Sequence, residues 1–124
     1  MRHIFIIFLI LLLSFPEILE SKKIETLYEW KTLSGTQCRE IGYKDFHAIY
    51  KGDVVMGRPD GVGTLVYPDG NKYVGEFIIG LFHGHGIYTI ASNGYIYTGE
   101  YRIGSLWNGI MKEKDGEIDF KVVN

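Results

Sequence analysis

From about residue 50 onward the chain alternates short apolar and aromatic runs with glycine-containing reversals. Tight turns are predicted where glycine, proline, asparagine and aspartate gather: Gly57-Arg58-Pro59, Pro68-Asp69-Gly70, Gly80-Leu81, Ala91-Ser92-Asn93-Gly94 and Lys114-Asp115-Gly116-Glu117. Glycine takes positive φ at such positions, and proline fixes φ at the first turn position. Short strands joined in sequence by tight turns predict an antiparallel β-meander, an all-β fold.

The strands carry an internal repeat. The pattern Tyr, any residue, Gly, acid begins at Tyr50, recurs at Tyr73 after 23 residues and at Tyr97 after 24 more. A second element, Asp60-Gly61-Val62-Gly63, matches His83-Gly84-His85-Gly86 at the same 23-residue spacing. Two elements in phase at a period between about 20 and 50 residues indicate a repeat architecture.

Centring each hairpin on its turn predicts the register of the sheet and three rows of residues on one face. The first row is entirely glycine: Gly52, Gly63, Gly75, Gly86 and Gly99. The row on one side of it is Tyr50, Leu65, Tyr73, Tyr88 and Tyr97. The row on the other side is Val54, Gly61, Phe77, Gly84 and Tyr101.

The aromatic rings beside the glycine row are the candidate binding face. This face consists of Tyr50, Tyr73, Phe77, Tyr88, Tyr97 and Tyr101. A ring that leans over a neighbouring glycine covers its bare backbone, so the rings are expected first of all to cover the glycine groove and to pack against residues 22–49. Rings left bare would form an apolar patch of the kind that marks a partner site.

Residues 1–21 have the pattern of an export signal. Met1-Arg2-His3 is basic, and Ile4 to Leu13 is an unbroken apolar run. This run has the length of a signal-peptide core and is shorter than the roughly 20 residues that cross a bilayer. Export to a periplasm, outer envelope or medium is therefore expected, with an uncleaved membrane anchor as the alternative because no A-x-A cleavage triplet follows.

Residues 22–49 are predicted to form a partly helical linker or lid. Ile24, Leu27 and Tyr28 have the spacing of a short amphipathic helix, and Thr36 could begin another short turn that ends at Gly42. The single cysteine, Cys38, excludes an internal disulfide and is expected to be buried or half-buried.

Charge and side-chain chemistry exclude several functions. The net charge of −2 supplies no positive field for nucleic acid. His83 and His85 share a strand face and are weak candidate metal ligands, but no second ligand cluster accompanies them, so neither a metal nor another cofactor is expected. Glu76 and Glu100 lie two strands apart, and no catalytic constellation is evident. The sequence therefore predicts a protein that is not an enzyme.

The motifs resemble the MORN repeat family. The match runs from about Tyr50 to Asn108 and is strongest over Tyr73-Val74-Gly75-Glu76-Phe77, Gly80 and His83-Gly84-His85-Gly86. The resemblance implies that residues 50–124 form an elongated single-layer sheet of hairpins. An export signal followed by such repeats also resembles the small exported MORN proteins of bacteria.

The resemblance also implies an interaction module. The expected partner is a protein or a cell-envelope surface, bound through the aromatic face or a sheet edge, with association with membrane as a further expectation. Binding of a glycan or a phospholipid headgroup on the aromatic and glycine groove is the alternative. An anionic headgroup favours a basic cluster, which Lys72, Arg102 and Lys112 do not form.

Overall fold

Three two-residue turns define the hairpins. The computed structural model describes residues 22–124, and in it φ is positive at both positions of Met56-Gly57 (52°, 73°), Ile79-Gly80 (47°, 78°) and Ile103-Gly104 (46°, 87°). Positive φ at both central residues is the type I′ geometry, whose twist matches that of the flanking strands. Each turn therefore folds two consecutive strands into one hairpin.

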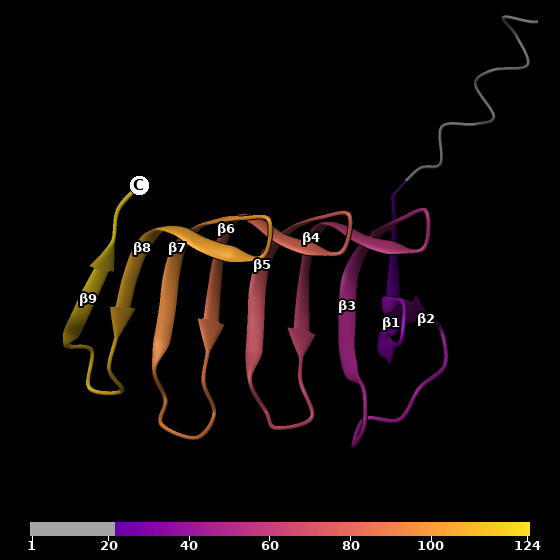
Figure 1. Ribbon diagram of the computed structural model, residues 1–124, viewed down its shortest axis with the longest axis horizontal. Helices are drawn as coiled ribbons and strands as arrows, with labels where there is room; N and C mark the ends of the chain where they lie inside the picture. The colour runs from indigo at the N-terminus through magenta and orange to yellow at the C-terminus, as the bar shows by residue number, and fades with distance from the viewer. Residues whose placement is uncertain (1–21) are drawn as a thin grey trace, which may run out of the picture.

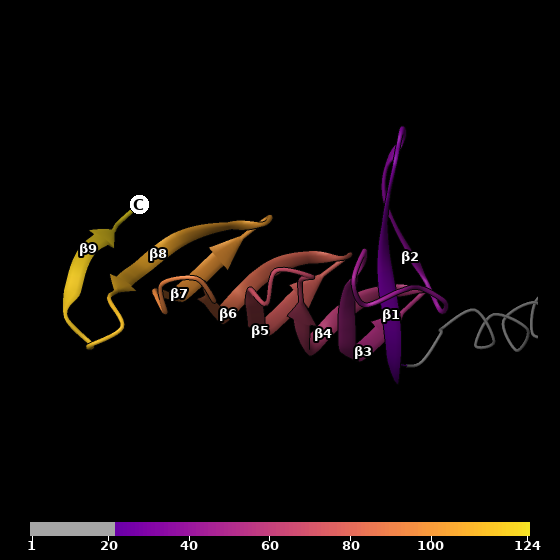
Figure 2. The same ribbon diagram turned by 90° about the horizontal axis from the view of Figure 1, so that it is seen from below.

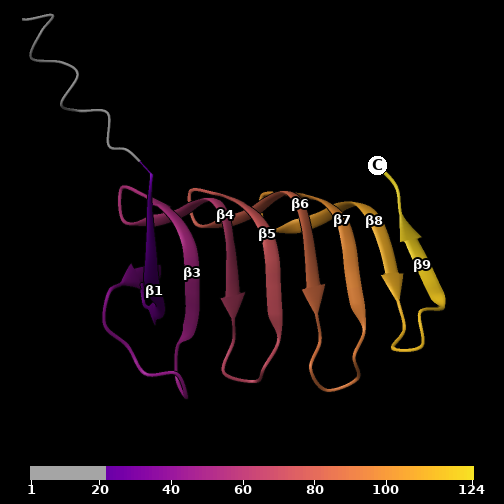
Figure 3. The ribbon, with the colours of Figure 1, turned by 180° about the vertical axis from the view of Figure 1, so that it is seen from behind.

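The strands form one nine-stranded sheet in which every adjacent pair is antiparallel. They are β1 (Lys23–Thr32), β2 (Gly35–Arg39), β3 (Ala48–Val55), β4 (Arg58–Val66), β5 (Lys72–Ile78), β6 (Leu81–Thr89), β7 (Ile96–Arg102), β8 (Ser105–Lys112) and β9 (Ile118–Val122). The order is β2-β1-β3-β4-β5-β6-β7-β8-β9. Strands β3 to β9 lie side by side in one elongated layer (Figures 1 and 3). The predicted meander is confirmed.

The helical prediction for residues 22–49 is wrong, because the structure places β1 and β2 there and residues 22–124 contain no helix. The apolar spacing of Ile24, Leu27 and Tyr28 is compatible with a helix, but the edge of β3 offers unpaired backbone groups. Residues 23 to 29 of β1 pair antiparallel with residues 48 to 54 of β3 and satisfy them.

The hairpin β1–β2 rises steeply from the line of the other strands when the sheet is seen from below (Figure 2). Leu27 of β1 is buried in the core, and the half-buried Cys38 of β2 packs against the same core. The hairpin thus covers one end of the aromatic face.

The predicted glycine row is present. Gly52 pairs with Gly63, Gly63 with Gly75, Gly75 with Gly86 and Gly86 with Gly99, and Gly109 extends the row into β8. The tyrosine row also has the predicted partners, from Tyr50 opposite Leu65 to Tyr88 opposite Tyr97.

The third predicted row is partly wrong, because bulges shift the register next to the type I′ turns. They follow Gly52, Gly75 and Glu100, so Val54 lies opposite Pro59 and Phe77 lies opposite Phe82. Only Gly61 opposite Phe77 and Gly84 opposite Tyr101 keep the expected pairing. A bulge adds one residue and increases the local twist, and here a register shift recurs beside the type I′ turn of each successive hairpin.

The export signal or anchor predicted for residues 1–21 lies outside the described residues. Within residues 22–124 there is no helix long and apolar enough to span a bilayer.

Candidate functional site

The first two tyrosines of the repeat cover glycines of the facing strand. A Cβ built on Gly63 would lie 2.5 Å from Cζ of Tyr50, and one on Gly86 would lie 2.5 Å from Cε2 of Tyr73. Each tyrosine also donates its hydroxyl to a backbone oxygen three residues on, Tyr50 to Asp53 at 2.6 Å and Tyr73 to Glu76 at 2.8 Å. The glycine and the tyrosine of the repeat therefore act as one structural unit.

The bare glycine strand lets rings two strands apart touch. Tyr50 of β3 meets Phe77 of β5 edge-on with ring centres 4.9 Å apart, and Tyr73 of β5 meets Tyr101 of β7 at 5.1 Å. Strands two apart are separated by about 9 to 10 Å, so a side chain on the strand between would keep these rings from meeting. The rings thus build the core of a one-layer sheet.

Four of the six predicted face residues are consequently buried. Tyr50 and Tyr73 are fully enclosed, and Phe77 and Tyr101 are 4% exposed. Burial raises the pKa of Tyr73 to about 12, and burial also raises the pKa of Tyr50 and Tyr101 above the ordinary value. These side chains are neutral packing residues.

The acid of the repeat supports the bulge. The Asp53 carboxylate accepts the Val62 N–H at 2.9 Å, and the Glu76 carboxylate accepts the His85 N–H. In both cases the acid follows a paired glycine of the row, lies within the bulge and binds the backbone of the facing strand. Glu100 instead pairs with Arg102 at 3.0 Å. The structure gives these carboxylates structural contacts.

The residue at the first position of the second repeat element, Asp60 or His83, accepts a hydrogen bond from the turn of the next hairpin. Oδ2 of Asp60 accepts the Ile79 N–H at 3.2 Å, and Nδ1 of His83 accepts the Ile103 N–H at 3.3 Å. His85 is exposed on the same strand as His83. Among residues 22–124 no group of three or more His, Cys, Asp or Glu side chains could hold a metal ion.

The part of the aromatic face that stays open lies over β6 to β8. Tyr88 and Tyr97 are half-exposed there. They line an apolar groove of about 360 Å³ together with Phe82, Ile90, Tyr101, Gly104 and Leu106. This volume is in the range of small-ligand and side-chain sites. The structure therefore brings Tyr88 and Tyr97 together at an accessible surface.

Tyr97 is open because it lies near the end of the array. The atoms nearest a Cβ built on Gly109 belong to Thr98, Leu106 and Gly99, and the Tyr97 ring is not among them. The hydroxyls of Tyr50 and Tyr73 bind backbone oxygens, but among residues 22–124 that of Tyr97 has no such bond. Its ring meets Phe120 of the terminal strand at 6.3 Å.

The groove continues beneath the N-terminal hairpin. A second hollow of about 260 Å³ shares Phe82 and Gly104 with the first and extends to Tyr67, Thr36 and Glu29. Sequence reasoning missed Phe82, Leu106 and Glu29 as surface-lining residues. Phe82 lies beside a predicted turn and would have been found had the bulge been foreseen, since the bulge places it opposite Phe77.

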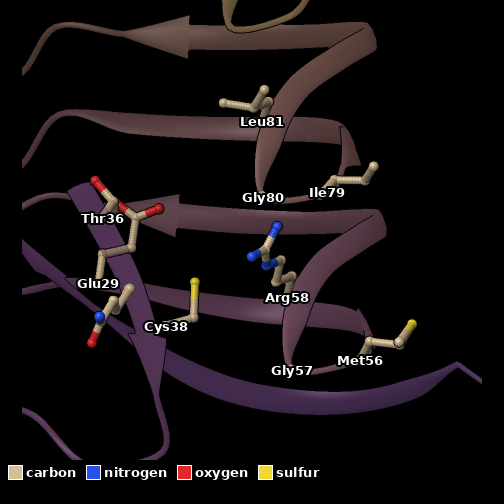
Figure 4. Close-up of a pocket in the computed structure, with 10 residues that line it drawn as sticks. Glu29, Thr36, Cys38, Met56, Gly57, Arg58, Ile79, Gly80 and Leu81 are labelled. Atoms are coloured by element: carbon tan, nitrogen blue, oxygen red, sulfur yellow. The ribbon is translucent and has the colours of Figure 1, made fainter. Parts of the chain in front are cut away.

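A larger and more polar hollow of about 480 Å³ lies between β2 and two of the tight turns (Figure 4). Glu29, Thr36 and Cys38 line it on one side, and Arg58 and Leu81 line it on the other. Burial and the Glu29 charge raise the pKa of the Cys38 thiol, while Arg58 acts in the opposite direction. The thiol is thus less reactive than a free cysteine.

Fold and face together define a scaffold of repeated β-hairpins with a single row of glycines under aromatic rings. The MORN repeat model matches residues 50–72 and 73–95. The chain therefore contains MORN repeats, and the two matched units contain the covering tyrosines Tyr50 and Tyr73.

The curated relatives share these repeats over a small part of their length. The chain is 55% identical over 40 residues to the ALS2 C-terminal-like protein of Bos taurus, an alignment covering 32% of this chain and 4% of the relative. It is 37% identical over 73 residues to the mouse protein of that name (59% and 8%) and 34% identical over 76 residues to human Alsin (57% and 5%). The chain thus matches less than a tenth of each relative, and the expected small, exported bacterial type stays a prediction.

Proposed function

We propose that this chain is a non-catalytic interaction module that binds a segment of another protein on the open part of its aromatic face. The observation that carries the proposal is the division within one row of tyrosines. Tyr50 and Tyr73 are enclosed in the core of the sheet, whereas Tyr88 and Tyr97 remain half-exposed around an apolar groove. Half-exposed tyrosines around a groove are typical anchors of protein interfaces.

The repeats support an interaction role because their polar side chains stabilise the sheet. Asp53, Glu76 and His83 each hold a backbone N–H. Export to a cell envelope or to the medium is part of the proposal and rests on the pattern of residues 1–21.

Affinity capture with the full chain tests the proposal. Tyr88→Ala with Tyr97→Ala should abolish capture of a protein that the wild type retains, since interface anchors commonly contribute more than about 1 kcal/mol each. Ile87→Ala is the matched control, because Ile87 lies between Gly86 and Tyr88 on the other face and is 45% exposed. Equal loss in the control variant would contradict the groove as the binding surface.

Two further arms separate the protein partner from the alternative ligands. The same three proteins are tested for co-sedimentation with phosphatidylserine vesicles and for binding to a glycan array. Tyrosine-dependent binding to vesicles or glycans, without a tyrosine-dependent protein partner, would replace this proposal with the headgroup or glycan alternative.

A further inference from the structure

The covered end of the aromatic groove carries a negative charge. Glu29 of β1 lies two residues beyond the buried Leu27, on the same face of the sheet, and pairs with Ala48 of β3 and Cys38 of β2. It lines the hollow that shares Phe82 and Gly104 with the open groove. A ligand that follows the groove from Tyr97 past Phe82 therefore ends at Glu29.

Among the residues that the structure describes, Glu29 has no partner that explains its placement. Within residues 22–124 the ion pair found is that of Arg102 with Glu100, and no hydrogen bond to the Glu29 carboxylate occurs there. Burial raises the pKa of this carboxyl, and the nearby Lys31 only partly opposes the effect. A partly desolvated, unpaired carboxylate is unfavourable for folding, and such groups gather at functional sites.

The other charges near Glu29 lie to its sides. Lys31 follows it on β1 and is exposed. Arg58 and Cys38 line the adjacent polar hollow, which Glu29 also lines (Figure 4), and they do not line the groove. The groove itself is thus lined mostly by apolar and aromatic side chains and is acidic at its covered end.

We propose that Glu29 selects the partner, which is a polypeptide segment with apolar side chains on Phe82, Tyr88 and Tyr97 and a lysine or arginine at Glu29. This inference rests on the proposed function and specifies its ligand. A cation at a half-buried carboxylate forms a charge-assisted hydrogen bond. An anionic headgroup would be repelled at the same place, and a neutral glycan would leave the carboxylate without a counter-charge.

Peptide selection tests the inference without a known partner. The full chain, immobilised through its C-terminus, selects from a random peptide library displayed on phage, in parallel with Glu29→Gln, Glu29→Lys and the Tyr88→Ala, Tyr97→Ala variant. Glu29→Gln keeps the shape of the side chain and removes its charge. Because an amide is easier to bury than a carboxylate, this variant should unfold at no lower temperature than the wild type at neutral pH.

The selected pools separate the role of Glu29 from the role of the groove. Wild-type peptides should join apolar residues to one lysine or arginine, Glu29→Gln should lose the basic preference, and Glu29→Lys should favour aspartate or glutamate. A basic wild-type peptide should bind Glu29→Gln about tenfold or more weakly. Equal charge in the wild-type and Glu29→Gln pools would overturn the role of Glu29 and leave the groove intact. Absence of any tyrosine-dependent enrichment would overturn the proposed function itself.

Discussion

Replacing Gly86 by alanine should destabilise the protein through the ring of Tyr73. The new methyl carbon would lie 2.5 Å from Cε2 of the ring and closer still to its hydroxyl oxygen. Carbon atoms in contact are normally about 3.5 to 4.0 Å apart, so the ring has to move. Tyr73 is fully buried, stacks on Phe82 at 3.8 Å and meets Phe77 at 5.0 Å.

The magnitude follows from two terms. Overpacking a filled site costs about 1–3 kcal/mol. Displacing the ring also breaks the 2.8 Å hydrogen bond from the Tyr73 hydroxyl to Glu76, which is worth about 0.5–1.5 kcal/mol. The free energy of unfolding should therefore fall by about 1.5–4.5 kcal/mol. Without the ring the sign would differ, because alanine in place of glycine at an unstrained position stabilises by about 0.4–1 kcal/mol.

Urea unfolding followed by circular dichroism measures this effect. Gly86→Ala is compared in the wild type and in a Tyr73→Leu background, where the shorter side chain leaves room for the methyl group. We expect the two substitutions to be coupled by at least about 1 kcal/mol, as for residues in contact. An unchanged cost of Gly86→Ala in the Tyr73→Leu background would show that the ring does not account for the glycine.

Three further predictions concern single side chains. Tyr73→Phe should lower the free energy of unfolding by about 0.5–1.5 kcal/mol, while Tyr97→Phe, whose hydroxyl has no hydrogen-bond partner among residues 22–124, should change it little; urea titration compares them. Burial raises the pKa of Tyr73 to about 12. The stabilisation of the folded state by the neutral Tyr73 hydroxyl is therefore complete below about pH 10 and is lost as the pH rises toward 12. In urea unfolding across this range, the free energy of unfolding should decline less steeply for Tyr73→Phe than for the wild type. His83→Ala should lower the free energy of unfolding by about 0.5–1.5 kcal/mol, because the hydrogen bond with the Ile103 N–H is lost, and His85→Ala should lower it by less than about 0.5 kcal/mol. Zinc should leave the melting temperature of the wild type unchanged. A rise in melting temperature on adding zinc would support a metal site instead.

Much of the sheet can be predicted because its register is encoded locally. Most reversals carry turn residues that the sequence reveals, and glycines recur at positions that pair across strands, so the amino-acid sequence is enough to align Gly52 to Gly99. The bulges cannot be foreseen, since an extra residue in a strand leaves no mark in the alternation of side chains. Residues around them, such as Phe82, are therefore assigned to the wrong partner or overlooked.

The N-terminal hairpin and the exposed groove depend on contacts between distant parts of the chain. The spacing of Ile24, Leu27 and Tyr28 fits either a helix or a strand, and the free edge of β3 decides for the strand. The predicted aromatic face treats six rings alike, although Tyr50 and Tyr73 meet a further ring two strands on and Tyr97 meets the peripheral Phe120. Burial thus depends on the place of each unit within the array.

The backbone links between turns bear on how such a chain changes in evolution. Gly80 donates its N–H to Pro59 at 2.8 Å and Gly104 donates to Phe82 at 2.9 Å, so each reversal is fixed by the hairpin before it. A tandem duplication of residues 73–95 would carry its own docking points at both ends and lengthen the molecule by two strands. The area of the surface available to a partner can therefore increase by one repeat at a time, while the existing repeats stay unchanged.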